Sequence, residues 1–200
     1  MNLNGPSELQ LDALREVANV GVGHAANALS ALVGGSVVQI DVPKVRLLAV
    51  SDLPEAIGGA DAQVVAASLE MTGGLSGRIL LVLPELDANR LCSLLLKREV
   101  SGELQSDAQS ALNEVANIVA SACLSAIGRL TSLKLLPSVP TLMQDSGGVV
   151  CDTLVDGAFG QQLMLLEARF MTRHSPAITG QLLVLPEAAS LKELLQRLGV

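Results

Sequence analysis

Residues 7–43 of this chain read SELQLDALREVANVGVGHAANALSALVGGSVVQIDVP, and residues 106–140 repeat the pattern as SDAQSALNEVANIVASACLSAIGRLTSLKLLPSVP. When the two stretches are aligned, each keeps a carboxylate or hydroxyl, then a Glu, then an Asn and then a distant Pro. These residues are Asp12, Glu16, Asn19 and Pro43 in the first stretch and Ser110, Glu114, Asn117 and Pro140 in the second. The polar residues are therefore repeated together with the apolar ones.

Each stretch predicts an amphipathic helix, because apolar residues recur at helical spacing. The apolar positions are Leu14, Ala18, Val22, Ala25, Leu29 and Val33 in the first stretch and Leu112, Val115, Val119, Ala122 and Ala126 in the second. Ser7 with Gln10, and Ser106 with Gln109, predict a capping box at each start, in which side chains satisfy free backbone donors. Residues three apart share a helix face, so the Glu and Asn of each motif point the same way.

The polar face of both predicted helices carries almost no charge. Small or neutral residues follow each motif asparagine: Gly23, Ala26, Asn27 and Ser30 in the first helix and Ser121 and Ser125 in the second. Gly21 and Gly23 each cost about 1 kcal/mol relative to Ala inside a helix, so each needs a packing or functional reason. A single Glu and Asn pair would be an ordinary helix-surface pair, with Glu favoured near the helix start. Two matched copies favour a function instead.

Composition restricts the class of protein. The chain has 200 residues, of which 50% are hydrophobic, enough for a substantial core, although it has no Trp or Tyr and only two Phe. A net charge of -7 and a pI of about 4.8 argue against nucleic-acid binding, which needs a basic patch. The cysteines, Cys92, Cys123 and Cys151, form no CxxC motif and suit reduced structural thiols in a cytoplasm.

Targeting and metal-binding signals are weak. The N-terminus shows no signal peptide, and no apolar stretch approaches the roughly 20 residues of a membrane helix. We therefore expect a cytoplasmic protein without membrane insertion. His24 and His174 have no Cys or His neighbour at ligand spacing, so we expect no metal site in this chain.

The rest of the chain also repeats. The first half predicts strands at 36–42 and 45–50, a short helical turn or connection at 52–61, a hairpin of 62–71 with 77–83, and a helix at 84–97. The second half predicts a strand at 133–139, a strand region at 149–155, a hairpin of 162–171 with 178–185, and a helix to Leu198. The hexapeptide LLVLPE occurs at 80–85 and again at 182–187.

These patterns predict an α+β fold with an antiparallel β-sheet on which the two long motif helices pack. We expect one domain over residues 1–200, made of two repeats at about 7–97 and 106–198 that are related by a pseudo-two-fold axis. Residues 98–106 form an exposed link between the repeats.

The doubled motif resembles the CheC, CheX and FliY phosphatases of bacterial and archaeal chemotaxis. The family pattern is Asp or Ser, three residues, Glu, two residues, Asn, twenty-two residues and Pro, and CheC-type chains carry it twice. The second stretch fits this pattern, whereas the first has one extra residue before its proline, which we place at Gly34 and Gly35. The stretch NVGVGHAANALSALVGG and the closing LLVLPEAASLKELLQRLG also resemble CheC-type chains. CheX would carry one motif and FliY extra flanking segments, so the CheC type fits best.

The resemblance implies a substrate and roles for the motif residues. The substrate would be the phosphoaspartate of a CheY-type response regulator, and its hydrolysis needs a positioned water and neutralised charge. The amides of Asn19 and Asn117 would each orient a water. Glu16 and Glu114 would dock the regulator by pairing with its lysine.

The resemblance also implies supporting residues and partners. Asp12 and Ser110 would cap or orient the motif helix, and Pro43 and Pro140 would end the helix-to-strand connection. Mg²⁺ would be held by the acidic residues of the regulator, so no cofactor is expected in this chain. A CheD-type receptor deamidase is a further partner that CheC proteins commonly bind.

Three alternatives remain open. The first is a non-catalytic CheC-like scaffold that binds a CheD-type deamidase or a regulator, although both motifs keep their Glu and Asn. The second is a hydrolase that uses Glu16 and Glu114 as acid and base, but it lacks Trp and Tyr platforms for a sugar. The third is a structural domain without activity, which the doubled motif disfavours.

Overall fold

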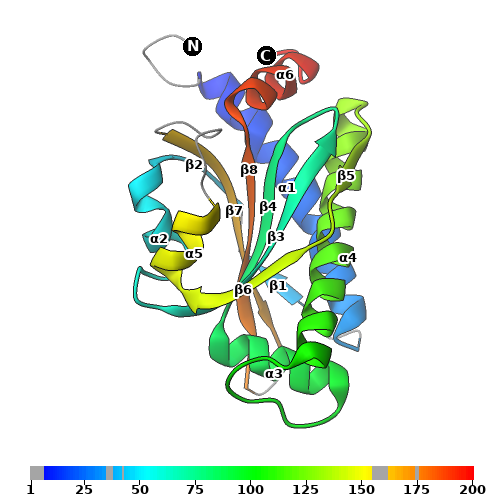
Figure 1. The fold of residues 1–200 in the computed structure, drawn as a ribbon. Coiled ribbons are helices and arrows are strands. Elements are labelled where there is room, and N and C mark those ends of the chain that lie inside the picture. The colour runs from blue at the N-terminus through cyan, green and yellow to red at the C-terminus, as the bar shows by residue number, and fades with distance from the viewer. Residues whose placement is uncertain (1–6, 35–37, 42, 155–161, 174–175) are drawn as a thin grey trace.

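The computed structural model of this chain describes residues 7–34, 38–41, 43–154, 162–173 and 176–200. In these residues one eight-stranded antiparallel sheet separates two layers of helices (Figure 1). The long helices α1 (Glu8–Leu32) and α4 (Ser106–Thr131) cover one face, and the short helices α2 (Leu53–Ala56) and α5 (Gly147–Leu154) lie on the other. The predicted α+β class and antiparallel sheet are confirmed.

The elements follow one another in a similar order in the two halves of the chain. In the first half, α1 is followed by β1 (Val38–Ile40), β2 (Lys44–Ala49), η1 (Val50–Asp52), α2, β3 (Gln63–Gly73), β4 (Gly77–Pro84) and α3 (Glu85–Leu96). In the second half, α4 is followed by β5 (Leu135–Pro137), β6 (Thr141–Ser146), α5, β7 (Gln162–Thr172), β8 (Thr179–Pro186) and α6 (Ala188–Arg197).

The two halves exchange strands. The leading strands β1 and β2 pair with β7 of the other half, and β5 and β6 pair with β3, while β4 and β8 meet in the middle of the sheet. The registers correspond, because Lys44 lies opposite Glu167 and Thr141 lies opposite Ser68. A pseudo-two-fold repeat would produce this exchange. The division into repeats of a single domain stays a prediction.

The motif helix α1 forms as its sequence predicts. The Ser7 N–H donates to Gln10 Oε1 at 3.0 Å, and the Gln10 N–H donates to Ser7 Oγ at 3.3 Å, which confirms the first capping box. Most predicted apolar positions are buried: Leu14, Ala18, Val22, Ala25, Leu29 and Val33 from the first stretch, and Leu112, Val115, Val119 and Ala126 from the second. Both helices therefore direct an apolar stripe into one core.

The predicted capping box of the second helix is wrong. The helix α4 already includes Ser106, and Gln105 at its cap makes no side-chain hydrogen bond to the helix. The Gln109 side chain donates to the Leu104 carbonyl at 2.8 Å instead. The tertiary position of the preceding link, in which Leu104 is buried, decides this helix start.

The predicted strand at 149–155 is also wrong, because residues 147–154 form helix α5 and Val155 lies outside the described residues. The β-branched pair Val149 and Val150 suggested a strand. In the structure, Val150, Cys151 and Leu154 are buried together with α2 at helical spacing, so tertiary burial overrides the local preference. The strand of this segment is β6, which the sequence analysis missed because it shows no apolar alternation.

The motif prolines lie between strands, immediately before β2 and β6. For Pro43 this position agrees with the strands predicted at 36–42 and 45–50, but neither proline ends the connection from the helix to the first strand. That connection uses left-handed residues instead, Gly34 with φ +77° after α1 and Ser132 with φ +56° after α4. Pro43 and Pro140 lack an N–H donor and therefore suit a position just before a strand. Gly34 lies where we placed the extra residue, and Gly35 is outside the described residues.

The helix α4 would pass for a membrane span by length and composition alone. The sequence alone predicts no such stretch. However, 56% of its most apolar window is buried inside the protein, where α4 packs on α1 and the sheet. Core helices pass the same test, so α4 gives only weak support for membrane insertion.

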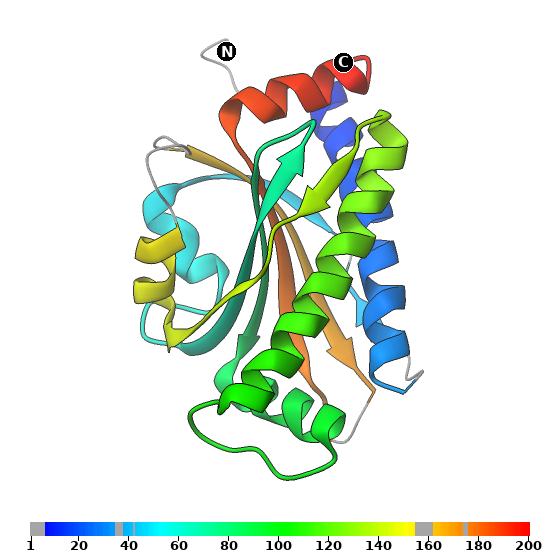
Figure 2. The ribbon, with the colours of Figure 1, turned by 45° about the vertical axis from the view of Figure 1, so that its right-hand side comes forward.

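The two helices α1 and α4 run antiparallel and pack closely on each other (Figures 1 and 2). Gly21 makes this contact possible, because a Cβ atom there would lie 2.9 Å from Cys123 Sγ and 3.1 Å from Ile127 Cγ1. Gly23 is exposed, and a Cβ atom there would meet nothing within 4 Å. Gly21 therefore has a packing reason, whereas packing does not explain Gly23.

Gly21→Val should lower the free energy of unfolding by about 1–3 kcal/mol, because the side chain would overpack the contact between the helices. As a matched control, Gly23→Ala should raise it by about 0.5–1 kcal/mol, since Ala restricts the unfolded chain and meets open space. Urea unfolding would measure both changes. Equal stability of Gly21→Val and the wild type would contradict this account of the contact.

Candidate functional site on the two motif helices

The motif residues lie on the outer face of the helix layer. Glu16 and Asn19 are exposed on α1, and Glu114 is exposed and Asn117 partly exposed on α4. Each pair is one helical turn apart, so both side chains of a pair reach the same part of the surface. The structure thus presents two similar surfaces to solvent.

Beyond the motif, both surfaces carry mainly small, uncharged side chains, with the exposed imidazole of His24 on α1 as the exception. Between Glu16 and the end of α1, and between Glu114 and Arg129 of α4, the sequence contains no Asp, Glu, Lys or Arg. Gly23 and Ser125 are exposed within these segments. A partner can therefore bring its backbone close to either helix without displacing long side chains or burying unpaired charge.

The two motifs form separate sites. The helices α1 and α4 are antiparallel (Figure 2). Because Gly21 packs against Cys123, Glu16 lies toward one end of the helix pair and Glu114 toward the other. With a rise of about 1.5 Å per residue, the two carboxylates are roughly 20 Å apart along the pair. An acid and base pair of a glycoside hydrolase needs a separation of about 5–9.5 Å. This geometry excludes the hydrolase alternative.

Asp12 holds an arginine that the sequence analysis did not single out. Arg15 Nη1 donates to Asp12 Oδ1 at 2.6 Å, and both side chains are about half or more exposed, at 49% and 68%. The spacing of three residues between acid and base was the available signal, since such residues face each other on a helix. Arg15 also precedes Asn19 by four residues and so shares its face.

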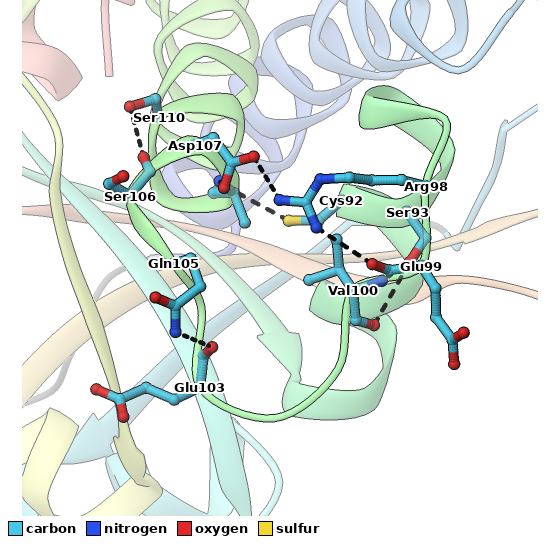
Figure 3. Close-up of polar contacts among 11 residues, drawn as sticks. Cys92, Ser93, Arg98, Glu99, Val100, Glu103, Gln105, Ser106, Asp107 and Ser110 are labelled. Carbon is cyan, nitrogen blue, oxygen red and sulfur yellow. Dashed lines mark hydrogen bonds and ion pairs between the residues drawn. The ribbon is translucent and has the colours of Figure 1, made fainter.

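Ser110, the counterpart of Asp12, bonds to its own helix. Its hydroxyl donates to the Ser106 carbonyl at 2.7 Å (Figure 3). A hydroxyl engaged with the backbone suits a supporting role in the second motif, as does the ion pair of Asp12 in the first. Asp12 and Ser110 therefore differ in their hydrogen-bond partners as well as in residue type.

The start of α4 is tied to the α3–α4 link. Arg98 donates to the Asp107 carboxylate and, at 3.2 Å, to the Glu99 carbonyl (Figure 3). Asp107 also accepts the Ala108 N–H at 2.9 Å. The hydrogen bond from Arg98 is the main reason that the pKa of Asp107 lies below its usual range. Burial, reinforced by the Asp107 carboxylate, raises the pKa of the Cys92 thiol to about 11.

All three cysteines are free and buried, as expected for structural thiols. Burial raises the pKa of Cys123 and of Cys151 to about 12, so these thiols are neutral near pH 7. Among the described residues, no group of three His, Cys, Asp or Glu side chains could hold a metal ion. His174 lies outside those residues.

Comparison with known proteins places these features in a family. The sequence model of the CheC-like family matches residues 9–46, and that of the chemotaxis phosphatase CheX matches residues 65–156. A Bacillus subtilis (strain 168) protein named CheY-P phosphatase CheC is 32% identical over 208 residues, which cover 98% of this chain and 97% of the relative. This chain belongs to the CheC family.

Solved structures share the CheC-family fold described here. Thermotoga maritima FliY superposes with a TM-score of 0.77 at 20% identity, covering 97% of this chain and 98% of FliY. The CheX chain from a Borrelia burgdorferi complex of CheX, CheY, BeF3 and Mg²⁺ superposes with a TM-score of 0.58 at 14% identity, covering 88% of this chain and 99% of that one. At these identities the structures show a common fold.

Arg98→Met should raise the pKa of Asp107 toward the ordinary range of an aspartate, because the hydrogen bond that lowers it is lost. The pKa of Asp107 is lower in the folded protein than in the unfolded chain. The ion pair therefore stabilises the fold at pH values above the pKa that Asp107 has in the unfolded chain. This stabilisation is lost as the pH falls through the pKa that Asp107 has in the folded protein. NMR titration of the Asp107 carboxylate would measure the change. Arg197→Met, which breaks the exposed pair with Glu193 on α6, serves as the control. An unchanged Asp107 titration in Arg98→Met would refute the assigned cause.

Proposed function

We propose that this protein hydrolyses the phosphoaspartate of a CheY-type response regulator in chemotaxis signalling. The observation that carries the proposal is the presence of two Glu and Asn pairs that reach the surface, with Asn117 partly exposed and the other three residues exposed, in a member of the CheC family. The relative that is 32% identical over nearly the whole chain is named a CheY-P phosphatase. The fold is shared with a complex of CheX and CheY, which supports a CheY-type regulator as the partner.

Asn19 and Asn117 are proposed to orient the attacking water, each at its own site. Phosphoryl transfer depends mainly on positioning and on stabilising charge. An amide offers one acceptor and two donors without a negative charge, so it can hold a water near an anionic phosphoryl group. Exposure of these side chains lets them enter the active site of a docked regulator.

Glu16 and Glu114 are proposed to dock the regulator. A carboxylate would repel the phosphoryl group, but it would form a charge-assisted hydrogen bond with a lysine of the regulator. Each Glu lies one turn before the Asn, with Cβ atoms roughly 5–6 Å apart, so the ion pair would fix the Asn over the phosphoaspartate.

The remaining chemistry is assigned to the regulator. We place the Mg²⁺ ion in the regulator, held by its own acidic residues, and no cofactor in this chain. Asp12, Ser110, Pro43 and Pro140 are proposed to support the motif helices. Free, buried cysteines agree with a cytoplasmic location. Binding of a CheD-type deamidase without catalysis is the weaker alternative, because both motifs keep an exposed Glu and an accessible Asn.

Asn19→Ala combined with Asn117→Ala should reduce the acceleration of phosphate release about 100-fold or more, because no amide would position the water. Each single variant should keep the activity of the other site. The assay is phosphate release from a phosphorylated CheY-type regulator with Mg²⁺. Gln196→Ala, which removes an exposed amide on α6, is the matched control. Near-wild-type release by the double variant would reject the assignment, and no release by the wild type would favour the scaffold.

Glu16→Ala combined with Glu114→Ala should raise KM about tenfold, equivalent to roughly 1.4 kcal/mol of docking free energy, and change kcat little. The physical reason is that the ion pair with the regulator holds the complex together before and during the reaction. Steady-state kinetics at varied regulator concentration would separate the two constants. Glu193→Ala on α6 is the control, and an unchanged KM in the motif variant would argue against docking.

A further inference from the structure

The two sites differ in charge beside the motif asparagine. At the first site Arg15 precedes Asn19 by four residues, so the two side chains share a face with Cβ atoms roughly 5–6 Å apart. At the second site the corresponding residue is Asn113, which precedes Asn117 by four residues. The amide of Asn19 therefore has a cationic side chain beside it, whereas the amide of Asn117 has a neutral one.

Arg15 is held at the surface in a form that leaves it able to bind an anion. Its Nη1 donates to Asp12 at 2.6 Å, and 49% of its side chain is exposed. A guanidinium has five N–H donors in a planar fork, so one bond to Asp12 leaves others for phosphoryl oxygens. The ion pair limits the conformations of the long side chain near Asn19.

The second site cannot supply the same charge. Asn113 is partly buried, and its Oδ1 is a buried atom without a hydrogen-bond partner in the described part of the chain. Ser110, which replaces Asp12, donates to backbone instead of holding a side chain. The α3–α4 link brings an arginine, Arg98, to α4, where it binds Asp107. Asp107 lies about 15 Å along the helix from Asn117.

We propose that Arg15 is a catalytic residue of the first site, that Asp12 positions it, and that the two sites therefore turn over at different rates. This inference rests on the proposed phosphatase function. In the reaction a water oxygen bonds to phosphorus while the bond between phosphorus and the carboxyl oxygen breaks. The electron pair of that bond goes to the aspartate carboxylate, and the water protons leave with the phosphate. Arg15 stabilises the negative charge on the phosphoryl oxygens in the transition state.

A purely structural ion pair would behave differently. An exposed ion pair three residues apart contributes little to stability. Its removal should therefore change the activity of both sites equally or of neither site. A catalytic Arg15 acts only on the site that contains Asn19. The effect should also appear in kcat and not in KM, since the interaction strengthens in the transition state.

The experiment isolates each site in the full chain. Asn117→Ala leaves only the first site, and Asn19→Ala leaves only the second. Adding Arg15→Met should lower kcat for phosphate release at least about tenfold in the first background and less than about twofold in the second. Arg15→Lys should recover part of the loss, because it keeps the charge without the fork. Asp12→Ala should lower kcat in the first background, but have no further effect once Arg15 is Met.

Arg98→Met in the Asn117→Ala background is the matched control, because it removes an equally exposed, ion-paired guanidinium far from Asn19. Its kcat should not change. Equal rates with and without Arg15→Met in the first background, or a change in KM alone, would overturn the inference and leave the phosphatase function intact. A first site that releases no phosphate while the second does would also overturn it. No release in either background would overturn the proposed function, and this inference with it.

Discussion

The close contact between α1 and α4 determines where both motifs lie. Gly21 has no side chain to separate the helices, so Cys123 and Ile127 pack directly against α1. This contact buries the apolar stripes of both helices against the sheet and leaves the opposite faces to solvent. The helices are antiparallel (Figure 2), and the same contact therefore directs the two similar motifs toward opposite ends of the helix pair. The surface therefore offers two separate sites instead of one paired site.

The sheet supports this arrangement through strand exchange. The strands that follow α1 pair with β7, and those that follow α4 pair with β3, so each helix is anchored to a hairpin of the other half. The core is built from Leu, Val, Ile, Ala and Met with very few aromatic residues. Close packing of small side chains takes the place of large rings, which explains why a single added Cβ at Gly21 matters.

The surface chemistry of the two motifs underlies the proposed division between docking and catalysis. Neutral, small residues beyond Glu16 and Glu114 favour close approach of a partner backbone, and the glutamates carry the charge that we propose for recognition. The amides suit water near an anion because they carry no charge. Arg15 and Asn113 make the two sites unequal in charge, although their Glu and Asn spacing is identical. A duplicated motif thus need not give duplicated activity.

The sequence by itself determined the long helices, both hairpins, the α+β class, the cap at Ser7 and the spacing of Glu16 from Asn19. These depend on neighbours within a few residues, which a periodic pattern reports directly. Only the tertiary structure decided that residues 147–154 are helical, that α4 lacks its predicted capping box, and that Pro140 precedes a strand. It also decided that Glu16 and Glu114 lie far apart. These features depend on contacts between residues distant in the chain, such as α5 with α2 and α1 with α4, which local patterns cannot encode.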